Sequence, residues 1–297
     1  MWFPAPIVCY GEALWDVLPA GRHPGGAPCN VALHLHQLGW PVRLISRVGD
    51  DELGRELLAF VTARGLDPAL VQLSATHLTG VVKANVQVGS EQVNYKIAQP
   101  QAWDYIQHTE DLRAAAGQAH MLVYGTLAAR SQVSRETLYR LLQHARFKVL
   151  DLNLRAPHYS RQVVTYLIRQ ANLLKLNQAE LAEIMAWHGQ PATAATAVPW
   201  LAEQFGLQAV CLTRGAAGAS LYAGDTWWHC PGIAVKVEDP IGCGDAFLAA
   251  LLVGWATDLP PGECLRQACA AGALVASRHG ATPAFTQADL KTLLDTA

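Results

Sequence analysis

Two glycines and an aspartate stand directly before an apolar run in the stretch EDPIGCGDAFLAALLVGW, residues 238–255. Pro240 ends any preceding strand, and Gly242 and Gly244 allow backbone dihedrals with positive φ. The N–H groups of this loop can then converge with a helix N-terminus on an anion. Two interpretations of Asp245 follow. It either caps the helix, or it accepts a proton from a hydroxyl that attacks a phosphoryl group held by those amides.

A second glycine pair, Gly25-Gly26, precedes another helical pattern near the N-terminus. Paired glycines allow a ligand to approach the backbone closely, and Asn30 offers both a donor and an acceptor. Asp16 follows the first predicted strand, on the side where α/β proteins bind ligands. One carboxylate, one amide and bare backbone suit a polyol better than an anion.

Two common nucleotide motifs are excluded or weak. The sequence contains no Gly-Lys dipeptide, so the phosphate loop of P-loop proteins is absent. Gly242 and Gly244 begin a G-x-G pattern, but Phe247 stands where the dinucleotide fingerprint needs its third glycine. An NAD-dependent oxidoreductase therefore has little support from the sequence.

Together the two glycine-rich segments resemble the PfkB family of carbohydrate kinases, which have the ribokinase-like fold. The first segment matches the family pattern of Gly-Gly, a small residue or proline, Asn and spaced glycines. The second matches a pattern in which D-T-x-G-A-G-D-x-F is commonest, with Pro240, Ile241 and Cys243 as departures. Cys243 keeps a small side chain and its backbone N–H. The resemblance assigns Asp245 as the catalytic base, and residues 242–244 as the site of the transferred phosphoryl group.

The segment Asp151-Leu-Asn153-Leu-Arg155 alternates, so its polar side chains share one face at the end of a strand. It resembles the D-x-N-x-R segment of fructokinase-type and ketodeoxygluconate-type members. The resemblance implies that Arg155 faces the transferred phosphoryl group. The structural alternative is an Asx-rich turn leading into Pro157, which accounts for Asn153 but not for the alternation.

Further segments match the nucleotide and metal positions of the family. Asn177 and Glu180 resemble the N-x-x-E element, which implies that Glu180 acts on Mg²⁺ through water, although the same pair is also a helix capping box. The turn from Thr213 resembles one that lies along the nucleotide phosphates. Asp239, with the loop 278–285, matches a monovalent cation site. The resemblance therefore implies ATP and Mg²⁺ as cofactors, with K⁺ as a further candidate. The predicted turn residues are Thr213, Gly215 and Gly218.

Buried strands and helical patterns must position these residues. Short β-branched or apolar runs alternate with longer helical runs, which predicts an α/β fold with a mainly parallel sheet. An exception is the stretch 79–98, which has the alternation of a β-hairpin around Gly89-Ser90. With the resemblance, we expect a ribokinase-like three-layer α/β/α sandwich. One PfkB-type kinase domain covers 1–297, with a small β-lid formed by roughly 12–24 and 79–98. The expected strands are 7–11, 42–49, 121–125, 148–153, 173–177 and 209–213, and expected helices include 29–39, 52–65 and 134–146.

The composition fits this class of protein. Of 297 residues, 51% are hydrophobic and 15% charged, which favours a large buried core, and the net charge of −2 gives no basic field for nucleic acid. The longest apolar run, 246–256, is too short to span a bilayer. Seven scattered cysteines without a C-x-x-C pair indicate a reducing cytoplasm. Homodimers through the lid are common in the family, so we expect one here.

The resemblance therefore implies an ATP-dependent kinase that phosphorylates a primary hydroxyl of a small carbohydrate, with Asp16, Gly25, Gly26 and Asn30 holding the sugar. The segments match bacterial fructokinases best, so fructose is the first expectation. A 2-keto-3-deoxygluconate kinase or another PfkB sugar kinase is the alternative. A different class of function is a protein that senses a sugar or a nucleotide and has lost catalysis. A protein that only binds has no need of a base such as Asp245.

Overall fold

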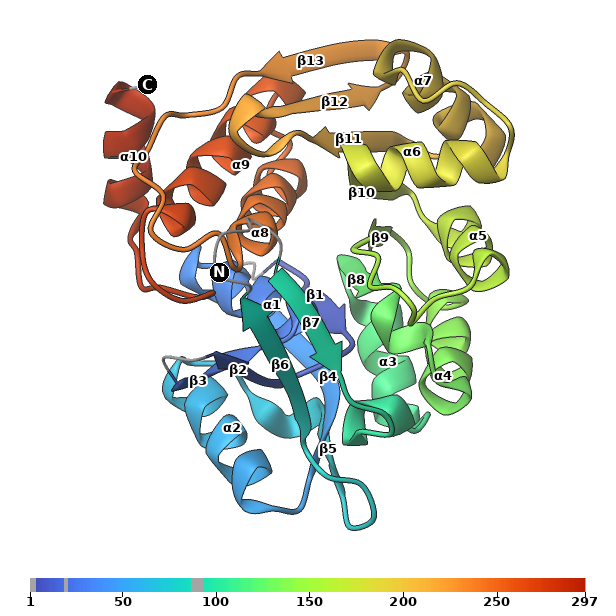
Figure 1. The fold of residues 1–297 in the computed structure, drawn as a ribbon, viewed down its shortest axis with the longest axis vertical. Helices are drawn as coiled ribbons and strands as arrows, with labels where there is room; N and C mark the ends of the chain where they lie inside the picture. Colours follow the sequence, from blue (N-terminus) through green and yellow to red (C-terminus); the bar gives the residue numbers. More distant parts are fainter. Residues whose placement is uncertain (1–3, 19–20, 87–92, 297) are drawn as a thin grey trace.

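The computed structural model describes residues 4–18, 21–86 and 93–296. Within these residues, the main sheet has nine strands in the order β13-β12-β11-β10-β9-β8-β1-β4-β5 (Figure 1). The pairs from β5 to β11 are parallel, as predicted from the alternation of strands and helices. The strands are β1 Ile7–Tyr10, β4 Val42–Gly49, β5 Val71–Ser74, β8 Met121–Gly125, β9 Lys148–Asp151, β10 Leu173–Asn177, β11 Ala209–Thr213, β12 Ala219–Ala223 and β13 Thr226–Cys230.

The last two strands of this sheet are antiparallel. Only Gly224 and Asp225 separate β12 from β13, and both have positive φ, 51° and 59°. Two such residues form the tight turn whose twist matches a β-hairpin. A connection this short leaves no room for a crossover helix, so the sheet ends in an antiparallel edge.

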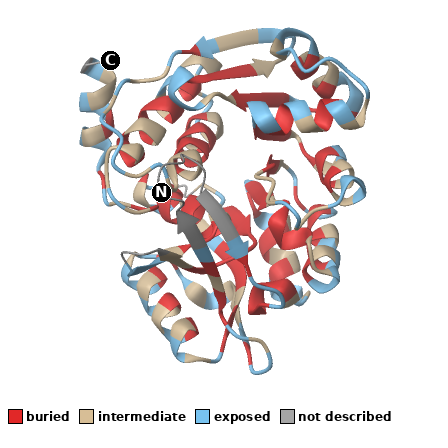
Figure 2. Cartoon of the chain, in the orientation of Figure 1, coloured by how far each residue is buried: buried red, intermediate tan, exposed pale blue. Residues whose placement is uncertain are grey.

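Helices cover both faces of the main sheet and complete the three-layer α/β/α sandwich. Side chains on each strand alternate between two cores: Ile7 and Cys9 enter one, and Val8 and Tyr10 the other. Figure 2 shows the central strands and α8 as mostly buried. The first core is covered by α1 Ala27–Gln37, α2 Glu52–Ala63, α8 Cys243–Ala256, α9 Pro261–Ala276 and α10 Gln287–Thr296, and the second by α3 Glu110–Gln118, α4 Gln132–Leu142, α5 Arg161–Gln170, α6 Gln178–Trp187 and α7 Ala194–Phe205.

A second, four-stranded sheet has the order β3-β2-β6-β7. Its strands are β2 Leu14–Leu18, β3 Gly21–Gly25, β6 Gly80–Val86 and β7 Val93–Ile97, so it contains both stretches expected to form the lid. The pair β2–β6 is parallel and the other pairs are antiparallel. The predicted turn at Gly89-Ser90 lies outside the described residues.

A buried ion pair fastens this small sheet to the rest of the molecule. Both carboxylate oxygens of Asp104 accept hydrogen bonds from Arg130 at 2.7 Å, and Arg130 also donates to the carbonyl of Ala98, just after β7, at 2.7 Å. The same guanidinium lies 4.0 Å from the ring centre of Trp103. Trp103 belongs to a small apolar cluster with residues of β2, β6 and β7. These contacts fasten the base of the small sheet to the segment 102–105, which packs against β4.

Candidate active site

A cleft of about 310 Å³ lies at the carboxyl ends of the central strands, large enough for a small ligand. It lies where the strand order reverses, since β1 pairs with β4 on one side and β8 on the other. Val82 of β6 and Ile97 of β7 provide apolar parts of its wall. The full lining is Glu12, Leu14, Asp16, Gly26, Ala27, Asn30, Val82, Ile97, Leu127, Asp151, Asn153, Arg155, Lys175, Asn177, Thr213, Pro240, Ile241, Gly242, Gly244 and Asp245.

The two glycine-rich segments meet in this cleft. The side-chain amide of Asn30, on α1, donates a hydrogen bond of 2.8 Å to Oδ2 of Asp245, in the first turn of α8. Gly242 precedes α8 in the left-handed conformation, with φ 80°. A Cβ on Gly242 would lie 2.1 Å from the carbonyl oxygen of Ala281, so only glycine fits this turn.

Asp245 does not cap the helix through its side chain, since its carboxylate turns to Asn30. Its own N–H donates to the carbonyl of Gly242 at 3.1 Å. The amides that α8 offers to an anion are therefore those of Gly242, Cys243 and Gly244, because the first N–H groups of a helix have no partner within it. Gly242, Gly244 and Asp245 line the cleft, whereas Cys243, between the two glycines, is not part of its lining.

Burial and, to a smaller extent, the nearby charge of Asp151 raise the pKa of Asp245, which stands at about 7. The hydrogen bond from Asn30 and the positive charge of Lys175 act in the opposite direction. Burial outweighs them. The carboxyl group therefore gains and loses its proton near neutral pH, where a general base works best.

The glycine pair at the start of α1 lies close to the opposite wall, and backbone packing requires a glycine at Gly26. A Cβ on Gly25 would lie 2.0 Å from Oδ2 of Asp16, and one on Gly26 would lie 2.4 Å from the carbonyl oxygen of Glu12. Gly26 also has φ 100°. Burial raises the pKa of Asp16 to about 6, while the charge of Arg155 lowers it. This end of the cleft therefore presents carboxyl groups and bare backbone.

Positive charge lies at the other end. Lys175 on β10 donates to both oxygens of Asp151 on β9, at 2.8 and 3.0 Å. Burial alone would lower the pKa of Lys175, but Asp151, together with the charges of Asp245 and Glu180, outweighs it, and the pKa stands above its ordinary value. An added Cβ on Gly244 would lie 3.6 Å from Nζ of Lys175, which places this ammonium group beside the N-terminus of α8. Arg155 also lines the cleft.

Lys175 and Glu12 are residues of the cleft that the sequence analysis did not identify. Lys175 interrupts the apolar strand LLKLN, and a charged residue inside a buried strand is itself a signal of a site, because burial of an unpaired charge is costly. Glu12 directly follows the first strand, at the edge where ligands bind. That position was available from the sequence.

Asn177 and Glu180 form a capping box at the start of α6. The N–H of Glu180 donates to Oδ1 of Asn177 at 3.0 Å, and the N–H of Asn177 donates to Oε2 of Glu180 at 2.8 Å. The N–H of Leu154 donates to Oε1 of Glu180 at 2.9 Å. Glu180 thus holds the loop that carries Arg155. Asn177 lines the cleft and Glu180 does not.

The other predicted residues surround the cleft. Thr213 lines it at the end of β11, whereas Gly215 and Gly218 lie in the following turn, outside the lining. A Cβ on Gly218 would lie 2.1 Å from the carbonyl oxygen of Cys230, so packing requires this glycine. Asp239 accepts hydrogen bonds of 3.0 Å from the N–H groups of Ile241 and Gly280, and so joins the loop before α8 to the loop after α9.

Comparisons with known proteins agree with this architecture. Residues 8–288 match the model of the pfkB family of carbohydrate kinases. The chain is a PfkB-family carbohydrate kinase. It is thus a phosphotransferase with an alcohol group as acceptor. The kinase is 30% identical to a fructokinase from Klebsiella pneumoniae over 302 residues, covering 94% of this chain and 95% of that one. It is 26% identical to Fructokinase-1 from Oryza sativa subsp. japonica, with 98% of both chains covered.

Solved structures share the fold of this kinase. A fructokinase from Xylella fastidiosa with bound ATP superposes with a TM-score of 0.88 at 23% identity, over 98% of both chains. A fructokinase from Vibrio cholerae, bound to fructose, ADP and potassium ion, gives a TM-score of 0.85 at 23% identity over 98% of both chains. These similarities confirm the ribokinase-like fold expected from the sequence.

Two negative findings concern the described part of the kinase. None of its helices there combines the length and apolar character needed to span a bilayer. Nor do His, Cys, Asp and Glu side chains gather there in threes with the geometry of a metal site.

Proposed function

We propose that this kinase transfers the γ-phosphoryl group of ATP to a primary hydroxyl of a small sugar, with fructose as the first candidate. The observation that carries the proposal is the 2.8 Å hydrogen bond from Asn30 to Asp245, which joins the two glycine-rich segments at the N-terminus of α8. The names of the relatives support the choice of acceptor, because relatives from bacteria and plants are fructokinases. One structural neighbour holds fructose and ADP, and another holds ATP.

In this proposal Asp245 is the general base. Its pKa of about 7 leaves a substantial carboxylate fraction at neutral pH, while the group remains basic enough to accept a hydroxyl proton. The hydrogen bond from Asn30 fixes the carboxylate, so one oxygen stays oriented while the other faces the acceptor. A positioned base of this kind contributes about 10²- to 10⁴-fold to a rate.

The amides of Gly242, Cys243 and Gly244 would stabilise the phosphoryl group as it moves. They belong to the N-terminus of α8, where the helix dipole favours negative charge. Lys175 adds positive charge beside these amides, and Arg155 adds a further positive charge in the cleft. Phosphoryl transfer needs little covalent work from the protein, so donors held in place before the reaction supply most of the catalysis.

The residues present fit Mg²⁺ bound together with the nucleotide. Glu180 offers hard oxygen donors, but both oxygens already accept backbone N–H groups, so it would reach the metal through water. Mg²⁺ commonly keeps several waters and takes few protein ligands. When bound, the ion neutralises charge on the phosphates of ATP. Asn177, Thr213, Gly215 and Gly218 are proposed to flank the nucleotide.

Other parts of the proposal follow the same resemblance. The small sheet serves as a lid over the sugar in a single kinase domain, since Val82 and Ile97 line the cleft. Its edge strands, β3 and β7, leave it able to pair in a homodimer.

Asp239 orients the loops where K⁺ would bind, an ion named for the Vibrio cholerae neighbour. All seven cysteines are free, as in a protein of the reducing cytoplasm.

The alternative acceptor is 2-keto-3-deoxygluconate. A sugar acid needs a cation at the sugar end of the cleft, and Arg155 is the candidate there. Carboxyl groups of Asp16 and Glu12 line the same end, which favours an uncharged sugar. A sensor without catalysis would have no use for a base held by Asn30.

The experiment is ADP release from Mg-ATP with fructose, ribose, tagatose, 2-keto-3-deoxygluconate and adenosine, with Asp245→Asn as the matched control. Strong turnover with fructose, lost in the variant, is the expected result. Turnover with ketodeoxygluconate alone would move the assignment to that acceptor. Silence with every sugar, from folded protein that binds ATP, would contradict the proposed function.

A further inference from the structure

His34 of α1 makes a buried contact that lies outside the cleft but touches the loop beside it. The side chain is 1% exposed, and its Nε2 lies 3.0 Å from the carbonyl oxygen of Ala281, in the loop after α9. A carbonyl oxygen only accepts, so Nε2 carries the hydrogen and donates it. Burial lowers the pKa of His34 to about 4, although the bond to Ala281 acts in the opposite direction. The ring is therefore a neutral donor near pH 7.

The loop 278–285 holds this ring from a second side. Phe285, itself buried, stacks on it with the ring centres 5.8 Å apart and the planes 24° apart. Towards its other end, the loop is tied to the segment before α8, because the N–H of Gly280 donates to Asp239 at 3.0 Å. The loop is thus fixed between His34 on α1 and the segment that leads into α8.

The peptide group of Ala281 packs directly against Gly242, the residue before α8. A Cβ added to Gly242 would lie 2.1 Å from the carbonyl oxygen of Ala281 and 2.7 Å from its carbonyl carbon. The oxygen that His34 holds is therefore the one that supports the turn at Gly242. Ala281 is 5% exposed. Without His34 this buried oxygen loses its donor, which is costly, so the peptide group would shift towards another one.

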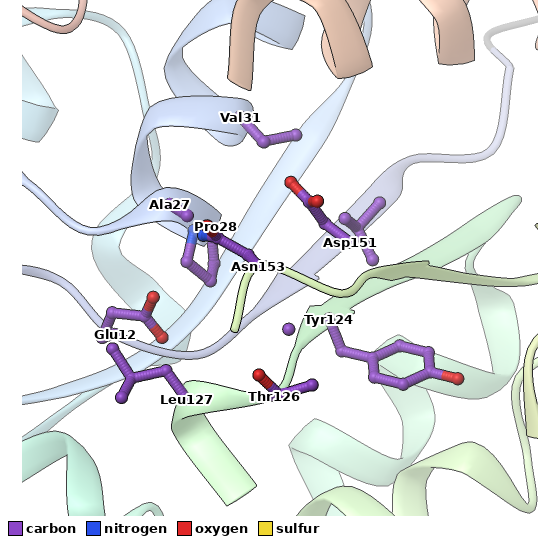
Figure 3. A pocket seen from close by; sticks show the side chains of 11 residues that line it. Glu12, Ala27, Pro28, Val31, Tyr124, Thr126, Leu127, Asp151 and Asn153 are labelled. Carbon is purple, nitrogen blue, oxygen red and sulfur yellow. The ribbon is translucent and has the colours of Figure 1, made fainter. Parts of the chain in front are cut away.

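The helix α1 supports two parts of the site from consecutive turns. Asn30, which donates to Asp245, lies four residues before His34, and such positions share one face of a helix. Residues 28–35 are all buried. Figure 3 shows Val31 of this helix among the side chains that line a small cavity at the ends of β8 and β9. A helix packed on several sides holds both contacts in a fixed relation.

We propose that His34 is a positioning residue for phosphoryl transfer, which holds the carbonyl of Ala281 and so fixes the amide of Gly242 in place. His34 does not line the cleft, so it acts through Ala281 and not on the substrate. One buried helix then sets both the base, through Asn30, and the turn at Gly242, through His34. This inference rests on the proposed function.

The test compares His34→Leu with His34→Gln, using the sugar that the wild type turns over fastest. Leucine keeps an apolar side chain against Phe285 but has no donor, whereas the amide nitrogen of glutamine replaces Nε2 as a donor. We expect kcat of His34→Leu to fall about 10- to 100-fold, because a displacement of about 1 Å costs up to about 100-fold. KM for the sugar should stay at the wild-type value. His34→Gln should recover most of the lost kcat.

Gln37→Ala is the matched control. Gln37 lies one turn further along α1 and donates to the carbonyl of Pro283 at 3.3 Å, so it holds the same loop. The three atoms nearest to a Cβ on Gly242 all belong to Ala281 and none to Pro283. The control should therefore keep the wild-type kcat, even where its Tm falls as far as that of His34→Leu.

Three results would overturn the inference: an unchanged kcat in His34→Leu, an equal loss of kcat in Gln37→Ala, or no recovery in His34→Gln. If His34→Leu does not fold, His34→Asn takes its place, since its amide is one carbon shorter than that of glutamine and keeps a polar side chain at this position.

Hydrogen exchange followed by mass spectrometry separates this inference from the proposed function, because it needs no turnover. Peptides that cover 239–246 should exchange faster in His34→Leu and at the wild-type rate in Gln37→Ala. A wild type that phosphorylates no sugar refutes the proposed function, while this difference in exchange still supports the contact. Normal turnover by the wild type, with equal kcat and equal exchange in all variants, refutes the inference alone.

Discussion

Replacing Asp245 by asparagine should stabilise the protein while lowering its turnover strongly. The pKa of this carboxyl group rises from an ordinary 3.8 to about 7 because the side chain is buried near Asp151. At 1.36 kcal/mol per unit, a rise of about three units corresponds to about 4 kcal/mol against the ionised form, as an upper limit. Water reaches part of the side chain, so we expect about 1–3 kcal/mol. Asparagine keeps an acceptor for Asn30 and carries no charge.

The sign of the pH dependence follows from proton uptake. Between about pH 4 and pH 7 the folded protein holds a proton on Asp245 that the unfolded chain releases, so this group's contribution to stability is present at low pH and is lost as pH rises through 7. The asparagine variant does not titrate there. Its advantage over the wild type should therefore be near zero at pH 4 and greatest above pH 7.

Thermal unfolding of both proteins from pH 4 to pH 8 measures this difference, with calorimetry or circular dichroism. An advantage of about 1–3 kcal/mol corresponds to roughly 2–6 °C in Tm above pH 7 for a protein of this size. Turnover should fall about 10²- to 10⁴-fold in the same variant. A Tm difference that does not change with pH, or a less stable variant at pH 8, would refute this electrostatic account of the site.

Three further substitutions probe the phosphoryl side of the cleft. Gly242→Ala places a Cβ 2.1 Å from the carbonyl oxygen of Ala281 and so displaces the backbone amide at this turn. Turnover should fall about 10²- to 10³-fold and Tm should also fall. Unchanged kinetics would contradict a role of this turn in the reaction. Lys175→Met leaves Asp151 buried without its partner, so the free energy of unfolding, measured with denaturant, should fall by about 3–5 kcal/mol. Adding Asp151→Asn should restore most of this loss. A double variant as unstable as the single one would argue against the ion pair. Burial raises the pKa of the Cys243 thiol, so little of the reactive thiolate is present at pH 7. Peroxide should therefore inactivate the wild type no faster than Cys243→Ser. Faster inactivation of the wild type would show that the thiol is reactive.

The sequence predicts the strands of the main sheet well because most are short apolar runs between turn residues. The bounds 42–49, 121–125, 173–177 and 209–213 match β4, β8, β10 and β11. Helix ends differ by a few residues, as for α4, expected from residue 134 and observed from Gln132. The antiparallel edge was not anticipated, since the pattern of β12 and β13 resembles any pair of strands until Gly224 and Asp225 are recognised as a tight turn.

The candidate site is harder to predict where two roles share one residue. Glu180 fits both a capping box and a metal-linked role, and the structure shows the capping bonds, which the sequence had left as an alternative. Lys175 and Glu12 each carry a local signal in the sequence, a charge inside an apolar strand and a carboxylate directly after the first strand, but that signal does not name their neighbours. Folding brings Asp151 beside Lys175 and closes the cleft around Glu12. Long-range contacts of this kind leave no spacing signal along the chain.

The most direct test of the account is the identity of the product formed from fructose and Mg-ATP. Mass spectrometry with ³¹P and ¹H NMR measures whether phosphate appears on the sugar and on which carbon. The account predicts a monophosphate ester coupled to a CH₂ group, formed by the wild type and reduced at least 100-fold in Asp245→Asn. A phosphate on a secondary hydroxyl, or equal product from the variant, would contradict it.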